Sequence, residues 1–150
     1  ELKKLLILHF QEFSPNKTAP FWLSFSKVAN KGFSVLILPI CWNNKILFGI
    51  ENLIGTDPEE KEGEFTGKVS GLPSFKEGKV TRLEAWLKSK NLSLASFEKS
   101  YFYSDSHNDL PLMEKVTHPV AVDSDDVLSE YAKSKGWPQI SLRWFVTYEG

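Results

Sequence analysis

Apolar residues in the second half of this chain form short runs that alternate with amphipathic segments. The runs at 101–104 and 118–122 have the length and composition typical of buried strands. Residues 79–90 place apolar side chains on one helical face, and further helices are predicted at 110–115 and 124–136. This alternation predicts an α/β fold with a parallel sheet flanked by helices.

The predicted helix at 124–136 has its own start and stop signals. Asp125 and Asp126 favour the positive end of a helix, and Gly136 is a typical stop. We expect Val127, Leu128 and Tyr131 to face the core.

The first half of the chain is less clearly patterned. Residues 33–38 read as a buried parallel strand, whereas 5–10 fits either a strand or a helix that starts at Leu2, and 46–54 fits either a short helix or a strand. Residues 57–71 are rich in Glu, Gly and Lys and predict an exposed hairpin. The remaining predictions are a helix at 21–30 and a last apolar segment at 140–145.

An acidic turn follows the predicted strand at 101–104. Asp105 and Asp109 lie four residues apart in it. Ligands of parallel sheets bind beyond the carboxyl ends of the strands, so these two acids can converge on one hard cation. On spacing alone, a solvated turn whose Asp and Asn side chains cap the next helix is an equal alternative.

Composition limits the classes of protein that fit. A chain of 150 residues with 41% apolar and 25% charged residues is typical of one globular domain. Its net charge of −1 and scattered lysines argue against nucleic-acid binding. The apolar stretch at 33–42 is too short to span a membrane. A single cysteine, Cys41, excludes an internal disulfide and favours a cytoplasmic location.

A family resemblance rests on three segments. The motif YSDSHNDLPL (103–112), with GLPSFKEGKV (71–80) before it and HPVAV (118–122) after it, resembles the phosphoserine-phosphatase-like branch, subfamily IB, of the haloacid dehalogenase superfamily. The resemblance runs from about residue 63 to residue 143 of an expected single domain, 1–150, while 1–62 is divergent or truncated. It implies a Rossmann-like sheet with the helical cap largely missing.

The resemblance also implies chemistry and residue roles. Members of this family hydrolyse small phosphorylated metabolites through an aspartyl-phosphate and use Mg²⁺. Asp105 matches a direct metal ligand, Asp109 the acid that supports the metal and its waters, and Asn108 a residue that helps to hold the site together and bind substrate. Lys79 matches the lysine that pairs with the nucleophile and the phosphoryl group. Its position alone ordinarily favours a solvated first-turn lysine, and only the family resemblance reverses that interpretation.

The chain departs from the family at the nucleophile. The family motif ends a strand with Asp-x-Asp, but no Asp precedes Asp57 here, and the run at 5–10 is followed by Gln11 and Glu12. Cys41 has no readable His and acid partners, which favours a buried cysteine. We therefore expect an incomplete or inactive phosphatase. The alternatives are a non-catalytic binding domain and the carboxyl-terminal piece of a longer phosphatase, with which a start at Glu1 rather than Met is compatible.

Overall fold

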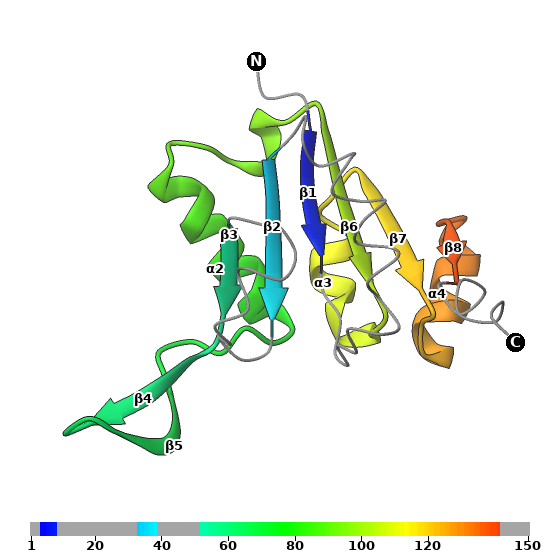
Figure 1. Ribbon diagram of the computed structural model, residues 1–150. Coiled ribbons are helices and arrows are strands. Elements are labelled where there is room, and N and C mark those ends of the chain that lie inside the picture. The colour runs from blue at the N-terminus through cyan, green and yellow to red at the C-terminus, as the bar shows by residue number, and fades with distance from the viewer. Residues whose placement is uncertain (1–3, 9–32, 39–51, 142–150) are drawn as a thin grey trace, which may run out of the picture.

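A six-stranded sheet forms the centre of the computed structural model, which describes residues 4–8, 33–38 and 52–141. The strand order is β3-β2-β1-β6-β7-β8, and all neighbouring pairs run parallel (Figure 1). The strands are β1 (Lys4–Leu8), β2 (Phe33–Leu38), β3 (Asn52–Gly55), β6 (Lys99–Ser104), β7 (His118–Val122) and β8 (Gln139–Ile140).

Strand β1 occupies the middle of this sheet. It pairs with β2 on one side, with Leu5 opposite Phe33, and with β6 on the other, with Ile7 opposite Phe102. Leu5, Ile7 and Phe102 are fully buried. An apolar run of this length fits a helix equally well, and pairing on both edges is what makes it a strand.

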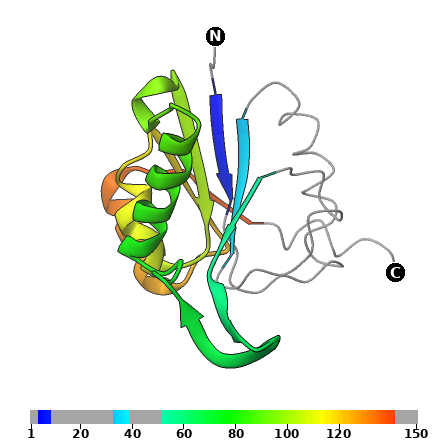
Figure 2. The ribbon, with the colours of Figure 1, turned by 90° about the vertical axis from the view of Figure 1, so that its left-hand side faces the viewer.

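Three helices cover one face of the sheet, as Figure 2 shows. They are α2 (Glu77–Ser89), α3 (Leu110–Met113) and α4 (Asp126–Lys135), accompanied by the short 3-10 turns η1 (Leu94–Ser96) and η2 (His107–Asp109). The core between sheet and helices includes Leu83, Leu87, Phe102, Leu112, Met113 and Leu128. No helix among the described residues is long and apolar enough to cross a membrane.

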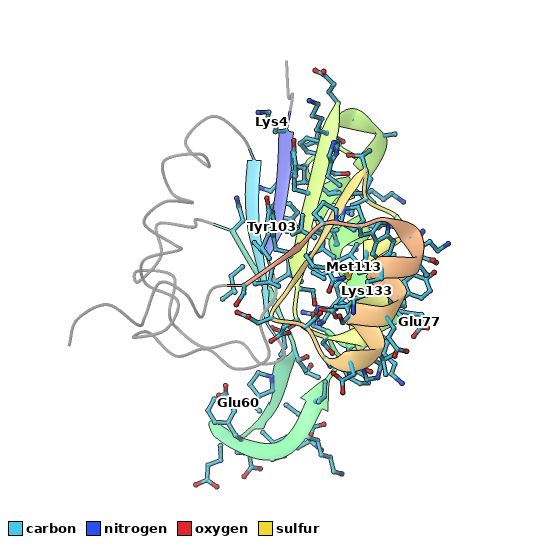
Figure 3. The ribbon with its side chains drawn as sticks, turned by 90° about the vertical axis from the view of Figure 1, so that its right-hand side faces the viewer. Lys4, Glu60, Glu77, Tyr103, Met113 and Lys133 are labelled. Carbon is cyan, nitrogen blue, oxygen red and sulfur yellow. The ribbon has the colours of Figure 1, made fainter. Side chains whose placement is uncertain are left out.

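A two-stranded antiparallel hairpin projects from the sheet. It consists of β4 (Asp57–Lys61) and β5 (Glu64–Ser70), linked by a turn in which Glu62 and Gly63 have φ of 53° and 83°. Figures 1 and 3 show it extending away from the domain, with Glu60 at its outer end. Every residue of β5 is exposed, so the hairpin contributes little to the core.

Most predicted elements of the described segments are confirmed. The strands at 33–38 and 118–122, the exposed hairpin and the helix from residue 79 agree with the structure, while β6 begins two residues earlier than expected. The described parts of the two ambiguous runs, 5–8 and 52–54, lie in the strands β1 and β3. The helix at 21–30, the nucleophile position, Cys41 and most of 140–145 lie outside the described residues.

One core prediction is wrong. Val127 is 57% exposed, whereas Leu128 and Ala132 are fully buried and Tyr131 is half-buried. Helix α4, which Asp125 caps, buries Leu128 and Ala132 against the sheet. These two residues are four positions apart and therefore lie on the same face of the helix. Val127 is rotated by about 100° from Leu128 on the helix and therefore faces outward.

Candidate active site

The carboxyl end of β6 delivers the acidic turn to one edge of the sheet. Burial alternates along β6, with Ser100, Phe102 and Ser104 buried under the helices and Tyr101 and Tyr103 half-buried on the other face. A row of small polar side chains after Tyr103 lets the backbone fold tightly into η2 and then α3. The local sequence therefore changes from strand to turn at Ser104.

Helix α2 brings Lys79 to this edge. Lys79 lies one turn before Leu83 and two before Leu87, on the buried stripe of the helix, and is only 2% exposed. Its neighbour Gly78 lies against the Pro73 carbonyl, where an added Cβ would stand 2.1 Å from the oxygen. Only glycine permits this approach, so Gly78 sets how deeply the start of α2 enters the domain.

Asp109 is the hub of the site. Its Oδ1 accepts a hydrogen bond from the ammonium of Lys79, and its Oδ2 accepts one from the hydroxyl of Ser104 at 2.5 Å. Asp109 and Ser104 are fully buried. Both oxygens of a buried carboxylate are thus engaged by donors, as burial of an ionised group requires.

The electrostatics of Lys79 depend on both acids of the turn. Burial lowers the pKa of the Lys79 ammonium, while Asp109, and more weakly Asp105, act in the opposite direction and raise it. The Asp105 carboxylate is therefore close enough to influence the lysine. Lys79 of α2, Asp105 just after β6 and Asp109 of η2 form one electrostatic unit.

Hydrogen bonds inside the turn fix its backbone. The amide of Ser106 donates to Ser104 Oγ at 3.2 Å, and Ser106 Oγ accepts from the amide of Asn108 at 3.2 Å. The side-chain amide of Asn108 also donates to Ser106 Oγ, at 3.3 Å. Asn108 thus braces the turn through Ser106.

The turn is also attached to α4. Asp125 Oδ2 accepts from the amide of His107 at 2.8 Å and lies 2.9 Å from its ring Nδ1. Burial would raise the pKa of Asp125, but the amides of Leu128 and His107 and the His107 ring outweigh it, so the pKa is lowered. His107 is therefore held in the turn by the Asp125 carboxylate.

The donor set of this turn suits a hard cation. Mg²⁺ favours carboxylate and water oxygens and is commonly held by one or two carboxylates plus substrate phosphate. Both oxygens of Asp109 already accept hydrogen bonds, one from Lys79 and one from Ser104. Within the described segments, no three His, Cys, Asp or Glu side chains group into a metal site.

Sequence reasoning found most of these residues but missed three. The structure brings together Asp105 and Asp109, which the spacing of the turn indicated, with Lys79 and Asn108, which came from the family resemblance. It adds Ser104, which holds Asp109, Gly78, which admits α2, and the cross-link from Asp125 to His107. The row of small residues around Ser104 was a readable signal, whereas the contact between residues 107 and 125 had none in the sequence.

A parallel sheet with an acidic turn at the carboxyl end of an inner strand defines a Rossmann-like α/β domain with its site at the sheet edge. A family model described as haloacid dehalogenase-like hydrolase matches residues 38–114, about half of the chain. The chain belongs to this family.

Individual relatives agree. A histidinol-phosphatase from Neisseria meningitidis is 50% identical over 109 residues, which cover 72% of this chain and 47% of that protein. A Bordetella pertussis protein of unknown function superposes with a TM-score of 0.79 at 25% identity, covering 95% of this chain and all of that one. Phosphoserine phosphatase in its apo form has a TM-score of 0.63 at 13% identity, over 99% and 100% of the two chains, and shows the shared fold. The chain spans about half, or less, of the length of the curated relatives it matches.

Proposed function

We propose that this chain is the metal-binding part of a magnesium-dependent phosphatase for a small phosphomonoester, and that with its present sequence it binds Mg²⁺ but turns over little or no substrate. The observation that carries the proposal is the buried Lys79–Asp109–Ser104 network beside Asp105. A cytoplasmic location fits such a substrate.

Charge explains why a cation is needed. Asp105 and Asp109 outnumber Lys79 in the described part of the site, so a phosphomonoester dianion approaching it alone would be repelled. Bound Mg²⁺ would offset that charge and stabilise negative charge on the phosphoryl oxygens. Asp105 would hold the ion directly, and Asp109 would support the ion and its bound waters.

Lys79 would contact the phosphoryl group. Asp109 fixes the ammonium at the end of a buried stem, so little side-chain freedom is lost when the lysine binds an oxygen anion. In a water-poor site such a positioned cation stabilises developing negative charge more strongly than it would in solution. Asn108 would help to position substrate by keeping the turn closed.

The expected lack of turnover follows from the sequence before Asp57. The family mechanism needs an aspartate nucleophile at the end of a strand, and no Asp occurs in residues 1–56. This same observation supports the second candidate, a binding domain that uses the site without chemistry. The proposed phosphatase part requires Asp105 for Mg²⁺ binding, whereas a binding domain would keep its function without Asp105.

Isothermal titration calorimetry of the full chain tests the proposal. We expect Mg²⁺ to bind the unchanged protein, inorganic phosphate to bind only when Mg²⁺ is present, and both events to be lost in Asp105→Asn. Asp126→Asn, which alters an exposed acid elsewhere, is the control and should bind like the unchanged chain. Failure of the unchanged chain to bind Mg²⁺, or equal binding by Asp105→Asn, would contradict the proposal.

An activity assay separates the remaining parts. With p-nitrophenyl phosphate or histidinol phosphate and Mg²⁺, we expect the chain to release phosphate no faster than Asp105→Asn does. Turnover that disappears in Asp105→Asn would instead show an active phosphatase with a nucleophile other than the family aspartate. Binding of a partner that persists when both Asp105 and Asp109 are replaced would favour the binding domain.

A further inference from the structure

Asp125 makes polar contacts with three separate segments of the site region. Its amide donates to the carbonyl of Asp105 at 3.0 Å. Its Oδ1 accepts from the amide of Leu128 at 2.8 Å and so caps α4, while its Oδ2 accepts from the amide of His107 at 2.8 Å. The same Oδ2 lies 2.9 Å from His107 Nδ1. One residue therefore joins the end of β6, the turn η2 and the start of α4.

The two carboxylate oxygens have different tasks. A helix cap requires only one acceptor, which here is Oδ1 on Leu128. The second oxygen is directed to His107, in the middle of the turn between Asp105 and Asp109. A residue that served only to start α4 would not need this second acceptor.

The turn is consequently anchored from two sides. On the inner side, Lys79 and Ser104 hold Asp109. On the outer side, Asp125 holds both the Asp105 carbonyl and His107. Asp105 lies between the two anchors, so its backbone has little room to move.

We propose that Asp125 is a positioning residue for the cation site: through His107 and the Asp105 carbonyl it fixes the backbone from which the Asp105 carboxylate projects. This inference rests on the proposed function, because it takes Asp105 as the ligand. Groups that orient a metal ligand typically change metal affinity about 10–100-fold when they are removed. Asp125 is thus expected to control how tightly Mg²⁺ binds, without contacting the ion.

The test is to measure Mn²⁺ binding by electron paramagnetic resonance on the full chain, well below its unfolding temperature. Asp125→Ser keeps a helix cap for Leu128 but is too short to hold His107 as well. We expect it to weaken Mn²⁺ binding at least about 10-fold. His107→Ala, which retains the backbone amide, should weaken binding less. The matched control, Asp126→Ser, alters the neighbouring exposed acid and should bind like the unchanged chain.

Two further comparisons make the result decisive. If Asp125 acts through His107, combining Asp125→Ser with His107→Ala should weaken binding no further than Asp125→Ser alone. Unchanged affinity in Asp125→Ser, with binding lost in Asp105→Asn, would overturn this inference and leave the proposed function intact. Unchanged affinity in Asp105→Asn would overturn both. A loss of thermal stability in Asp125→Ser with unchanged affinity would show that the contact with His107 only stabilises the fold, and would also overturn the inference.

Discussion

Two acidic regions of this molecule have opposite environments. The hairpin β4–β5 carries Asp57, Glu59, Glu60, Glu62 and Glu64, and nearly all of these side chains are exposed. The turn after β6 has only Asp105 and Asp109, yet Asp109 is fully buried and bonded to Lys79 and Ser104. The hairpin has more carboxylates, whereas the turn has fewer but holds Asp109 buried between hydrogen-bond donors.

The difference shows what makes a candidate site. In the hairpin, Glu59 lies 3.8 Å from Lys61 and Asp57 lies 2.7 Å from Arg82, ion pairs that water and salt weaken. At the turn, burial makes each charge depend on its partners, so the geometry is fixed before any ligand arrives. The number of acidic residues alone would have pointed to the hairpin as the cation site.

Replacing the buried lysine should have the largest effect. Lys79→Met keeps much of the side-chain volume but leaves the Asp109 carboxylate buried without its cation, which typically lowers the free energy of unfolding by about 3–5 kcal/mol. Urea unfolding followed by circular dichroism measures this change. Lys88→Met, an exposed position on the same helix, should stay within about 0.5 kcal/mol of the unchanged chain. Equal effects of the two changes would contradict the buried network.

An added methyl group at Gly78 should have the next largest effect. Helix propensity alone predicts that Gly78→Ala stabilises α2 by about 1 kcal/mol. The 2.1 Å approach of the new Cβ to the Pro73 carbonyl predicts the opposite, a loss of about 1–3 kcal/mol. Thermal unfolding decides the sign, with the exposed Thr81→Ala on the same helix as control. Stabilisation by Gly78→Ala would show that the start of α2 does not pack closely against the Pro73 carbonyl.

Loss of the α4 cap should have a moderate effect that depends on pH. Asp125→Ala removes the acceptor for Leu128 and should lower the free energy of unfolding by about 1 kcal/mol at neutral pH. Because the pKa of Asp125 is lowered in the folded protein, its carboxylate stabilises the fold above the unfolded-state pKa of about 3.9. That stabilisation is lost as pH falls through the lower, folded-state pKa.

Chemical denaturation at several pH values measures this dependence. The gap, which is the difference in free energy of unfolding between the unchanged chain and Asp125→Ala, should be largest near neutral pH. It should narrow below about pH 4. Asp126→Ala, the adjacent exposed acid, should show a smaller gap. A gap that widens toward acid pH would contradict the assigned partners of Asp125.

Changes in the hairpin should have the smallest effect. Glu60→Gln alters a carboxylate at an exposed position and should change the free energy of unfolding by less than about 0.5 kcal/mol. Mg²⁺ binding should be unchanged, as calorimetry would verify. Loss of binding in Glu60→Gln would move the site to the hairpin and reverse the comparison.

Local sequence signals predicted the elements, and tertiary contacts decided the rest. Helix α2 and the hairpin were predictable because amphipathic spacing and turn residues act within a few positions. Strand β1 was ambiguous because its apolar run takes its identity from β2 and β6 on either side. Val127 was misplaced because a one-residue difference in helix phase moves a side chain from core to solvent.

The candidate site was predictable to a similar degree. The acidic turn could be located from spacing, but the assignment of Lys79 came from the family resemblance, since a first-turn lysine is ordinarily solvated. The partners of Ser104 and Asp125 could not be assigned, because their bonds to Asp109 and His107 form only in the folded turn. Sequence thus indicated which groups carry charge, and the fold indicated which groups hold them.

The central claim is that the turn after β6, rather than the hairpin, is where a divalent cation binds. Paramagnetic broadening of backbone amide NMR signals by substoichiometric Mn²⁺ tests it directly, because both acidic regions are observed in one experiment. We predict that signals of residues 104–109 broaden first while those of residues 57–64 persist. Broadening that begins in the hairpin, or is equal in the two regions, would contradict the claim.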